Sequence, residues 1–194
     1  RLHANVWGVD SGWMVSSLDR GVSWTVVAFR YARGFKGILA LAIDPREART
    51  LYASVSSAGV FKSGDRGESW TATGLSDTTC ALDPDCFESP HNYQSLTVDP
   101  RNSQTLYAGA GPGFPEEGQG GVHKSEDGGT SWTLVGLTDH FVNILAIDPL
   151  TPQRLYACPY ESGVHRSDDG GSTWTEVSAG LPVTQVRSLV VSDQ

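Results

Sequence analysis

The sequence predicts an all-β fold made of four similar units, and three observations indicate it. A pattern of eight residues with Ser, Asp, Gly and Trp at positions one, three, five and eight occurs four times, and Thr follows each Trp. The copies end at Trp24, Trp70, Trp132 and Trp174, at intervals of 46, 62 and 42 residues. No stretch has convincing helical periodicity. Short strands with a period in the forties are typical of β-propeller blades.

The repeated pattern has the chemistry of a tight hairpin turn. The Asp carboxylate can accept backbone N–H bonds inside the turn, and Gly supplies a positive φ. The Trp begins the outgoing strand, where its large surface would pack against a neighbouring sheet. We therefore interpret the carboxylates as turn-forming groups rather than catalytic acids. The residues assigned to this structural role are Asp19, Gly21, Trp24, Asp65, Gly67, Trp70, Asp127, Gly129, Trp132, Asp169, Gly171 and Trp174.

The four stretches resemble Asp-box repeats, also called BNR repeats. Such repeats occur in sialidases, xyloglucan-cleaving glycosidases, sortilin-type receptors and the photosystem II assembly-factor family. The resemblance covers nearly the whole chain and implies a β-propeller. In those families the Asp box is an element of the fold, usually remote from the active site, so the resemblance transfers no activity to this chain.

Each period contains the four strands of a propeller blade. The first strand is apolar and ends in Asp-Pro, the second contains Leu-Tyr-Ala, the third enters the repeated turn, and the fourth leaves from the Trp. First strands are expected at Leu39–Pro45, Leu96–Pro100 and Leu145–Pro149. Second strands are expected at Thr50–Ala53, Thr105–Ala108 and Arg154–Ala157, and third strands at Gly59–Lys62, Gly121–Lys124 and Gly163–Arg166.

A single propeller domain of about four blades is therefore expected over residues 1–194. The blade repeats cover approximately 38–75, 94–136 and 143–179, and a further blade combines 1–30 with 186–194. In that blade Val6–Ser16 would form strands two and three, and Ser188–Val191 the innermost strand. Such an exchange would close a small ring and remove two exposed sheet edges. The alternative is that these blades are part of a larger propeller or parent chain.

Composition excludes several classes of function. The net charge of −8 argues against a nucleic-acid or anionic-membrane partner, and no apolar run is long enough for membrane insertion. Three cysteines without a Cys-x-x-Cys pair argue against a zinc site. Cys80 and Cys86 are either a small disulfide ring or free thiols, and Cys158 is expected in the core. His123 and His165 share one register, which Phe61 holds in another blade, so we interpret this position as packing between blades.

The irregular sequence is expected on one face of the propeller. The Asp-Pro turns and the repeated turns share the other face, and the long connections at Thr73–Gln94 and Gly109–Gly120 interrupt the repeat. Loops on a rigid scaffold are where binding residues concentrate. The candidate binding residues are Arg30, Tyr31, Phe87, Glu88, His91, Tyr93, Phe114, Glu116, Glu117, His140 and Tyr160.

Acidic groups beside exposed aromatic rings suit a carbohydrate or a protein ligand. The expected function is therefore a non-catalytic propeller that binds a protein or glycan through this loop-rich face. A purely structural repeat domain and solvated loops without a ligand are alternatives. No cofactor is expected, although Asp83, Asp85 and Glu88 are a candidate calcium site.

The enzymatic alternative is a sialidase-like or xyloglucanase-like glycoside hydrolase, or a fragment of one. Glu88 with Glu116 or Glu117 would be its acids, because glycoside hydrolysis usually uses two carboxylates. Sialidases use an arginine triad and a Tyr/Glu nucleophile pair, whereas the arginines of this chain are mostly in scaffold turns and no Arg-Ile-Pro-type motif is present. Many Asp-box proteins are secreted, periplasmic or lumenal, so the resemblance implies an extracytoplasmic location.

Overall fold

The protein is described by a computed structural model, which covers residues 2–7, 12–17, 19–27, 37–76, 92–111, 120–182 and 184–192. These residues form strands, turns and bends, without a helix long and apolar enough to cross a membrane. The first two sheets contain β1 (Leu2–Trp7), β2 (Gly12–Ser17), β3 (Thr25–Val27), β4 (Ile38–Ile43), β5 (Leu51–Val55), β6 (Gly59–Ser63) and β7 (Thr71–Ala72). The other two contain β8 (Tyr93–Val98), β9 (Leu106–Ala110), β10 (Gly121–Ser125), β11 (Thr133–Gly136), β12 (Val142–Ile147), β13 (Leu155–Pro159), β14 (His165–Ser167) and β15 (Thr175–Glu176).

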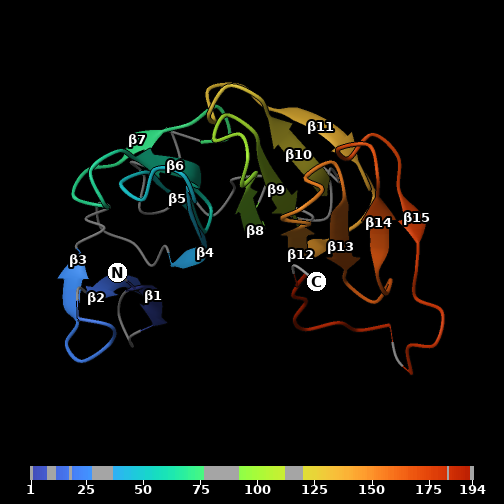
Figure 1. Cartoon of the computed structure of the whole chain (residues 1–194), viewed down its shortest axis with the longest axis horizontal. Coiled ribbons are helices and arrows are strands. Elements are labelled where there is room, and N and C mark those ends of the chain that lie inside the picture. The colour runs from blue at the N-terminus through green and yellow to red at the C-terminus, as the bar shows by residue number, and fades with distance from the viewer. Residues whose placement is uncertain are drawn as a thin grey trace.

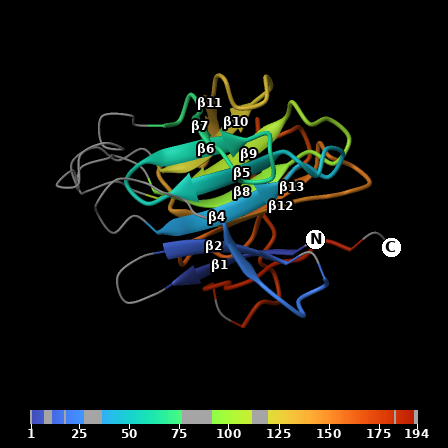
Figure 2. The same ribbon diagram turned by 90° about the vertical axis from the view of Figure 1, so that its left-hand side faces the viewer.

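The strands form antiparallel sheets in chain order, which confirms the predicted fold class. β4–β7, β8–β11 and β12–β15 are four-stranded sheets, and β1–β3 form a three-stranded sheet. β4, β8 and β12 are the innermost strands, through which neighbouring sheets contact each other. The four sheets follow one another along an arc in Figure 1. Figure 2 shows β1 and β2 beside β4, on the side away from β5.

Strand register identifies the position that β1 holds in its sheet. Leu2 of β1 lies opposite Ser17, the first residue of a repeated turn, as Leu51 of β5 lies opposite Ser63. The same relation pairs Leu106 with Ser125 and Leu155 with Ser167. β1 therefore holds the second position, and the first sheet, as far as the structure describes it, lacks an innermost strand.

The expected innermost strand at Ser188–Val191 differs from the structure, which assigns no strand to 184–192. The Gly163 amide instead donates to the Thr184 carbonyl at 2.9 Å. Residues 189–192 line a cavity of about 300 Å³ together with Tyr156 of β13. This segment therefore lies against the fourth sheet, and the strand exchange that we expected with the first blade is not formed.

One set of hydrogen bonds recurs in the four repeated turns, Ser17–Trp24, Ser63–Trp70, Ser125–Trp132 and Ser167–Trp174, which we call box turns. In the third box turn the Ser125 hydroxyl donates to Asp127 Oδ1 at 2.9 Å and accepts the Gly129 amide at 2.9 Å. The Asp127 carboxylate accepts the amide and the hydroxyl of Ser131. The other three turns have the same bonds to their Ser and Asp. Each carboxylate is thereby occupied within its own turn.

The box turns also connect neighbouring sheets. The Tyr52 hydroxyl of β5 donates to the Gly128 carbonyl in the next box turn at 3.2 Å, and Tyr107 of β9 reaches Gly170 in the same way at 3.3 Å. Trp174 packs with Tyr107 in one apolar cluster that joins the third and fourth sheets. Tyr52 and Tyr107, the tyrosines of two Leu-Tyr-Ala strands, are therefore contacts between sheets.

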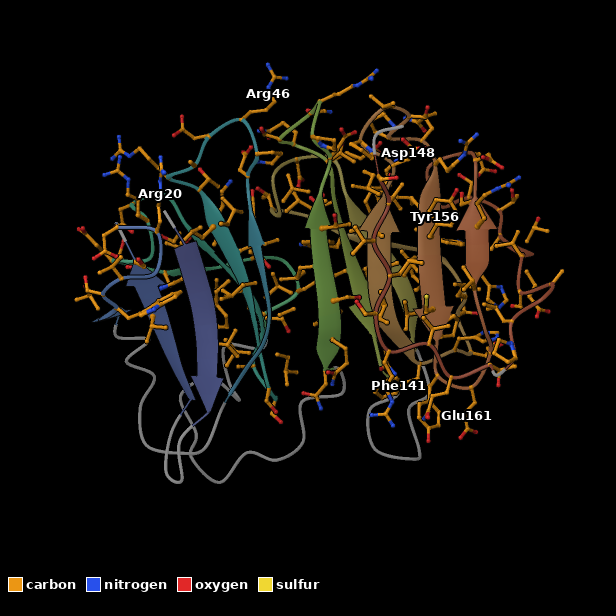
Figure 3. All side chains as sticks on the ribbon, turned by 60° about the horizontal axis from the view of Figure 1, so that its bottom comes forward. Arg20, Arg46, Phe141, Asp148, Tyr156 and Glu161 are labelled. Carbon is orange, nitrogen blue, oxygen red and sulfur yellow. The ribbon has the colours of Figure 1, made fainter. Side chains whose placement is uncertain are left out.

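The two faces of the molecule have different roles. Arg20 of the first box turn lies at the same end of the sheets as Arg46 and Asp148 of the Asp-Pro turns, whereas Phe141 and Glu161 lie at the opposite end (Figure 3). We call the first the turn face. The second is the loop face, where β12 begins and β13 ends.

The hydrogen bonds of the Asp carboxylates in the box turns predict that the fold loses stability in acid. Hydrogen bonds from the side chain and then the amide of Ser69, Ser131 and Thr173 lower the pKa of Asp65, Asp127 and Asp169 from 3.8 to about 2. A carboxyl with a lowered folded-state pKa stabilises the fold above its unfolded pKa and loses that contribution as the pH falls. The midpoint temperature of thermal unfolding should therefore decrease as the pH is lowered from about 4 to about 2. A midpoint that stays constant across this range in calorimetry would contradict this role.

Candidate functional site

Three of the eleven candidate binding residues are described by the structure: Tyr93, His140 and Tyr160. The candidates that lie outside the described residues are Arg30, Tyr31, Phe87, Glu88, His91, Phe114, Glu116 and Glu117. The candidate acids of a glycoside hydrolase are among these eight. Asp83 and Asp85 of the candidate calcium site and the cysteines Cys80 and Cys86 also lie outside the described residues.

Tyr93 does not have the exposed position that we expected for a binding residue. Its side chain is only 4% exposed and packs in the core between the second and third sheets. The ring lies edge-on to the ring of His123, with 5.5 Å between the two centroids. Burial also raises the pKa of the Tyr93 hydroxyl. Tyr93 is therefore a core residue, because it is the first residue of an innermost strand and its ring turns inward.

The residues that flank the two long connections lie next to each other. Asn92 follows the first connection, and its carbonyl accepts the Gly111 amide, which precedes residues 112–119, at 2.9 Å. A Cβ atom at Gly111 would lie 2.4 Å from the Phe141 ring, and one at Gly120 would lie 2.2 Å from the His140 carbonyl oxygen. Both ends of the second connection therefore pack directly against the segment that enters β12.

The close approach of Gly111 to the Phe141 ring predicts that a side chain added at Gly111 destabilises the fold. Gly111→Ala would push the Phe141 ring out of place and should lower the free energy of unfolding by about 1–3 kcal/mol. Gly64→Ala is the control, because a Cβ atom there has no neighbour within 4 Å. Urea unfolding of the two variants tests the contact, and equal stability of the two variants would show that Phe141 adapts without cost.

Tyr160 and Glu161 lie on a turn whose backbone conformation recurs after the second strand of the second sheet. The Tyr160 amide donates to the Phe141 carbonyl at 2.7 Å, as the Ser56 amide donates to the Gly37 carbonyl at 2.9 Å. The residues that follow, Glu161 and Ser57, have φ values of 55° and 53°. The same backbone thus carries Ser-Ser in one sheet and Tyr-Glu in the other, so the fold does not require the larger side chains.

Tyr160 is an exposed aromatic side chain at the edge of an open groove. It is 52% exposed, and its ring contacts that of Phe141 with 6.3 Å between the centroids. The groove has a volume of about 420 Å³, and its lining residues are Asn143, Ile144, Tyr160, Gln185, Val186 and Arg187. Two amide residues, a tyrosine and an arginine therefore line the groove together with the apolar Ile144 and Val186. The sequence pattern pointed to Tyr160 but not to Asn143, Gln185 or Arg187.

The histidines on this side of the fourth sheet have packing roles. The rings of His140 and His165 are 5.7 Å apart between centroids, and His165 Nε2 lies 3.1 Å from both the carbonyl and the hydroxyl oxygen of Ser162. Among the described residues there is no group of three His, Cys, Asp or Glu side chains that could hold a metal ion. His123 lies against Tyr93, whose side chain packs in the core between the second and third sheets.

Cys158 is a core residue, as the sequence predicted. It lies in β13 and is 1% exposed, and burial raises the pKa of its thiol to about 11. A buried thiol with so high a pKa contains almost no reactive thiolate at neutral pH.

The fold and the repeated turns define this chain as a β-propeller protein. It belongs to the DUF6242 beta propeller domain family, whose model matches residues 89–194, more than half of the chain.

A xyloglucanase from Hypocrea jecorina (strain QM6a) is 32% identical over 131 residues, which cover 61% of this chain and 14% of the xyloglucanase. The chain thus spans about one seventh of the length of this curated relative.

Two solved structures resemble the fold. The GH74 enzyme of Niastella koreensis matches 88% of this chain and 27% of its own, with a TM-score of 0.61 and 23% identity. YCF48 from Cyanidioschyzon merolae matches 79% of this chain and 42% of its own, with a TM-score of 0.55 and 12% identity. At these identities the likeness concerns the propeller fold alone.

Proposed function

We propose that this chain is a non-catalytic propeller segment that binds a glycan through its loop face, with Tyr160 as the stacking surface. The observation that carries the proposal is the shared turn, on which Tyr160 and Glu161 replace the Ser56 and Ser57 of the second sheet. Because the backbone accepts serine at both positions, the fold does not need the large aromatic and acidic side chains of Tyr160 and Glu161.

The chemistry of the groove supports a sugar ligand. An exposed tyrosine offers an apolar ring and a polar hydroxyl on a side chain with few rotatable bonds. The amides of Asn143 and Gln185 each supply a donor and an acceptor, which suits the hydroxyl pairs of a pyranose. A volume of about 420 Å³ lies within the range of small-molecule sites.

The relatives favour xyloglucan as the ligand. The similar proteins with curated functions are xyloglucanases, which cleave xyloglucan, and the same kind of polymer is therefore the first glycan to test. Such ligands occur outside the cytoplasm, so we also propose an extracytoplasmic location. Fractionation of the native cells would contradict this location if the protein were found in the cytoplasm.

Glycoside hydrolysis, by this chain or by a larger protein that contains it, is the second candidate function. The 32% identity to a xyloglucanase favours it. A hydrolase of this type needs two carboxylates at a defined separation across the substrate. The described part of the loop face has exposed carboxylates at Asp139 and Glu161, whereas the carboxylates of the box turns are on the turn face and hydrogen-bonded internally.

One experiment separates the two functions. Calorimetric titration of the full-length protein with xyloglucan and cello-oligosaccharides should give heat of binding without release of reducing ends. Binding together with steady release of reducing ends would establish the hydrolase instead. Neither binding nor hydrolysis across a panel of glucans, xylans and galactans would refute both.

A further inference from the structure

Among the described residues that line the groove beside Tyr160, Arg187 alone has a charged side chain. Arg187 is exposed and makes no ion pair with any residue that the structure describes. The exposed arginine of β14 in the same sheet differs, since Arg166 Nε lies 2.9 Å from Asp168 Oδ2. Arg187 therefore lines the groove, and the five N–H donors of its guanidinium have no carboxylate of the described chain to receive them.

The rest of the lining leaves this positive charge uncompensated. Asn143, Ile144, Tyr160, Gln185 and Val186 are all uncharged. The chain as a whole has a net charge of −8, so a lone cation in the groove does not reflect a generally basic protein. A ligand that brings a carboxylate to this position would gain a charge-assisted hydrogen bond, and the planar guanidinium matches a carboxylate in a bidentate pair.

We infer that this groove binds an acidic sugar, a pyranose ring with a carboxylate, as in a uronate residue of a polysaccharide. The inference rests on the proposed glycan binding and specifies its ligand. Arg187 pairs with the carboxylate, Tyr160 lies against the sugar ring, and Asn143 and Gln185 bond its hydroxyls. Glu161, next to Tyr160 and also without an ion pair in the described chain, repels a carboxylate and so favours the orientation toward Arg187.

An acidic peptide would offer the same carboxylate. A pyranose fits the remaining lining better, because the two amides suit neighbouring hydroxyl groups and the exposed tyrosine suits a flat sugar face. The structure therefore favours the glycan, and a peptide is one outcome of the test.

The test compares two ligands that differ only in the acidic branch. Xylo-oligosaccharides of one length, with and without a single glucuronate branch, are titrated into the full-length protein at low salt. The acidic ligand should bind about tenfold more tightly, and this advantage should shrink as salt screens the charges. Arg187→Gln should remove the advantage, so that the variant binds the acidic and the neutral ligand with affinities within about twofold of each other.

Arg166→Gln is the matched control, because this arginine is also exposed and belongs to the same sheet but does not line the groove. It should keep the wild-type preference. Equal affinity of wild type for both ligands would overturn the acidic specificity and leave the glycan-binding function intact. Binding of neither ligand would also overturn the inference, whereas the glycan-binding function is refuted only if xyloglucan and the wider panel of glycans fail to bind as well. Binding of a glutamate-rich peptide that depends on Arg187, without binding of either sugar, would also overturn the inference.

Discussion

Replacing Tyr160 with serine is expected to weaken glycan binding by roughly 30-fold, or about 2 kcal/mol of binding free energy. Tyr160 is the exposed aromatic ring of the groove, and central aromatic contacts commonly dominate binding. The midpoint of thermal unfolding should stay unchanged, because Ser56 holds the same position in the corresponding turn of the second sheet. Calorimetric titration and thermal unfolding of the same samples measure both effects.

Two variants show which part of the side chain matters. Tyr160→Phe keeps the ring and should bind within about threefold of wild type, because stacking does not need the hydroxyl. Glu161→Ser introduces the residue of the corresponding turn, Ser57, and should leave stability unchanged as well. If the Tyr160→Ser variant binds its glycan as tightly as wild type does, Tyr160 is not the stacking surface and the site must be placed elsewhere.

The second large effect concerns stability. Ser125→Ala should lower the free energy of unfolding by about 2 kcal/mol, because a buried donor without its acceptor costs about 1–3 kcal/mol. The Ser125 hydroxyl is 1% exposed and is the acceptor of the Gly129 amide at 2.9 Å, in a buried part of the turn. For a protein of this size that change corresponds to a drop of about 4–8 °C in the midpoint of thermal unfolding.

Ser131→Ala is the comparison within the same box turn. Its hydroxyl also bonds Asp127, at 2.5 Å, but it is exposed, so water can replace the lost bond. This variant should cost less than about 0.5 kcal/mol. Equal losses in the two variants would mean that the buried serine does not hold the turn together.

Much of the fold could be predicted from the sequence because its stabilising bonds are local. The Ser125 hydroxyl bonds both Asp127 and Gly129 within five residues, and the same spacing recurs in all four turns. The Leu-Tyr-Ala strands were predicted from their repetition, although the bond from Tyr52 to Gly128 joins residues 76 positions apart and has no local sequence signal.

The site was less predictable. Tyr93 and Tyr160 both lie near strand ends on the loop side of the repeat, and sequence alone treated them alike. Tyr93 begins an innermost strand and is buried between two sheets, whereas Tyr160 follows a second strand and is exposed. Ser188–Val191 has the apolar pattern of an innermost strand, yet the structure assigns no strand there, and its last three residues line a cavity together with Tyr156 of the fourth sheet.

The sequence by itself determined the all-β class, the four repeated turns and the order of strands in each sheet, since these depend on residues close together in the chain. Only the tertiary structure decided which side chains form the groove. Asn143, Tyr160 and Arg187 come from a strand, a turn and the segment after the last strand. They meet because the fourth sheet packs that segment against β12 and β13, and such a meeting of distant segments leaves no periodic signal in the sequence.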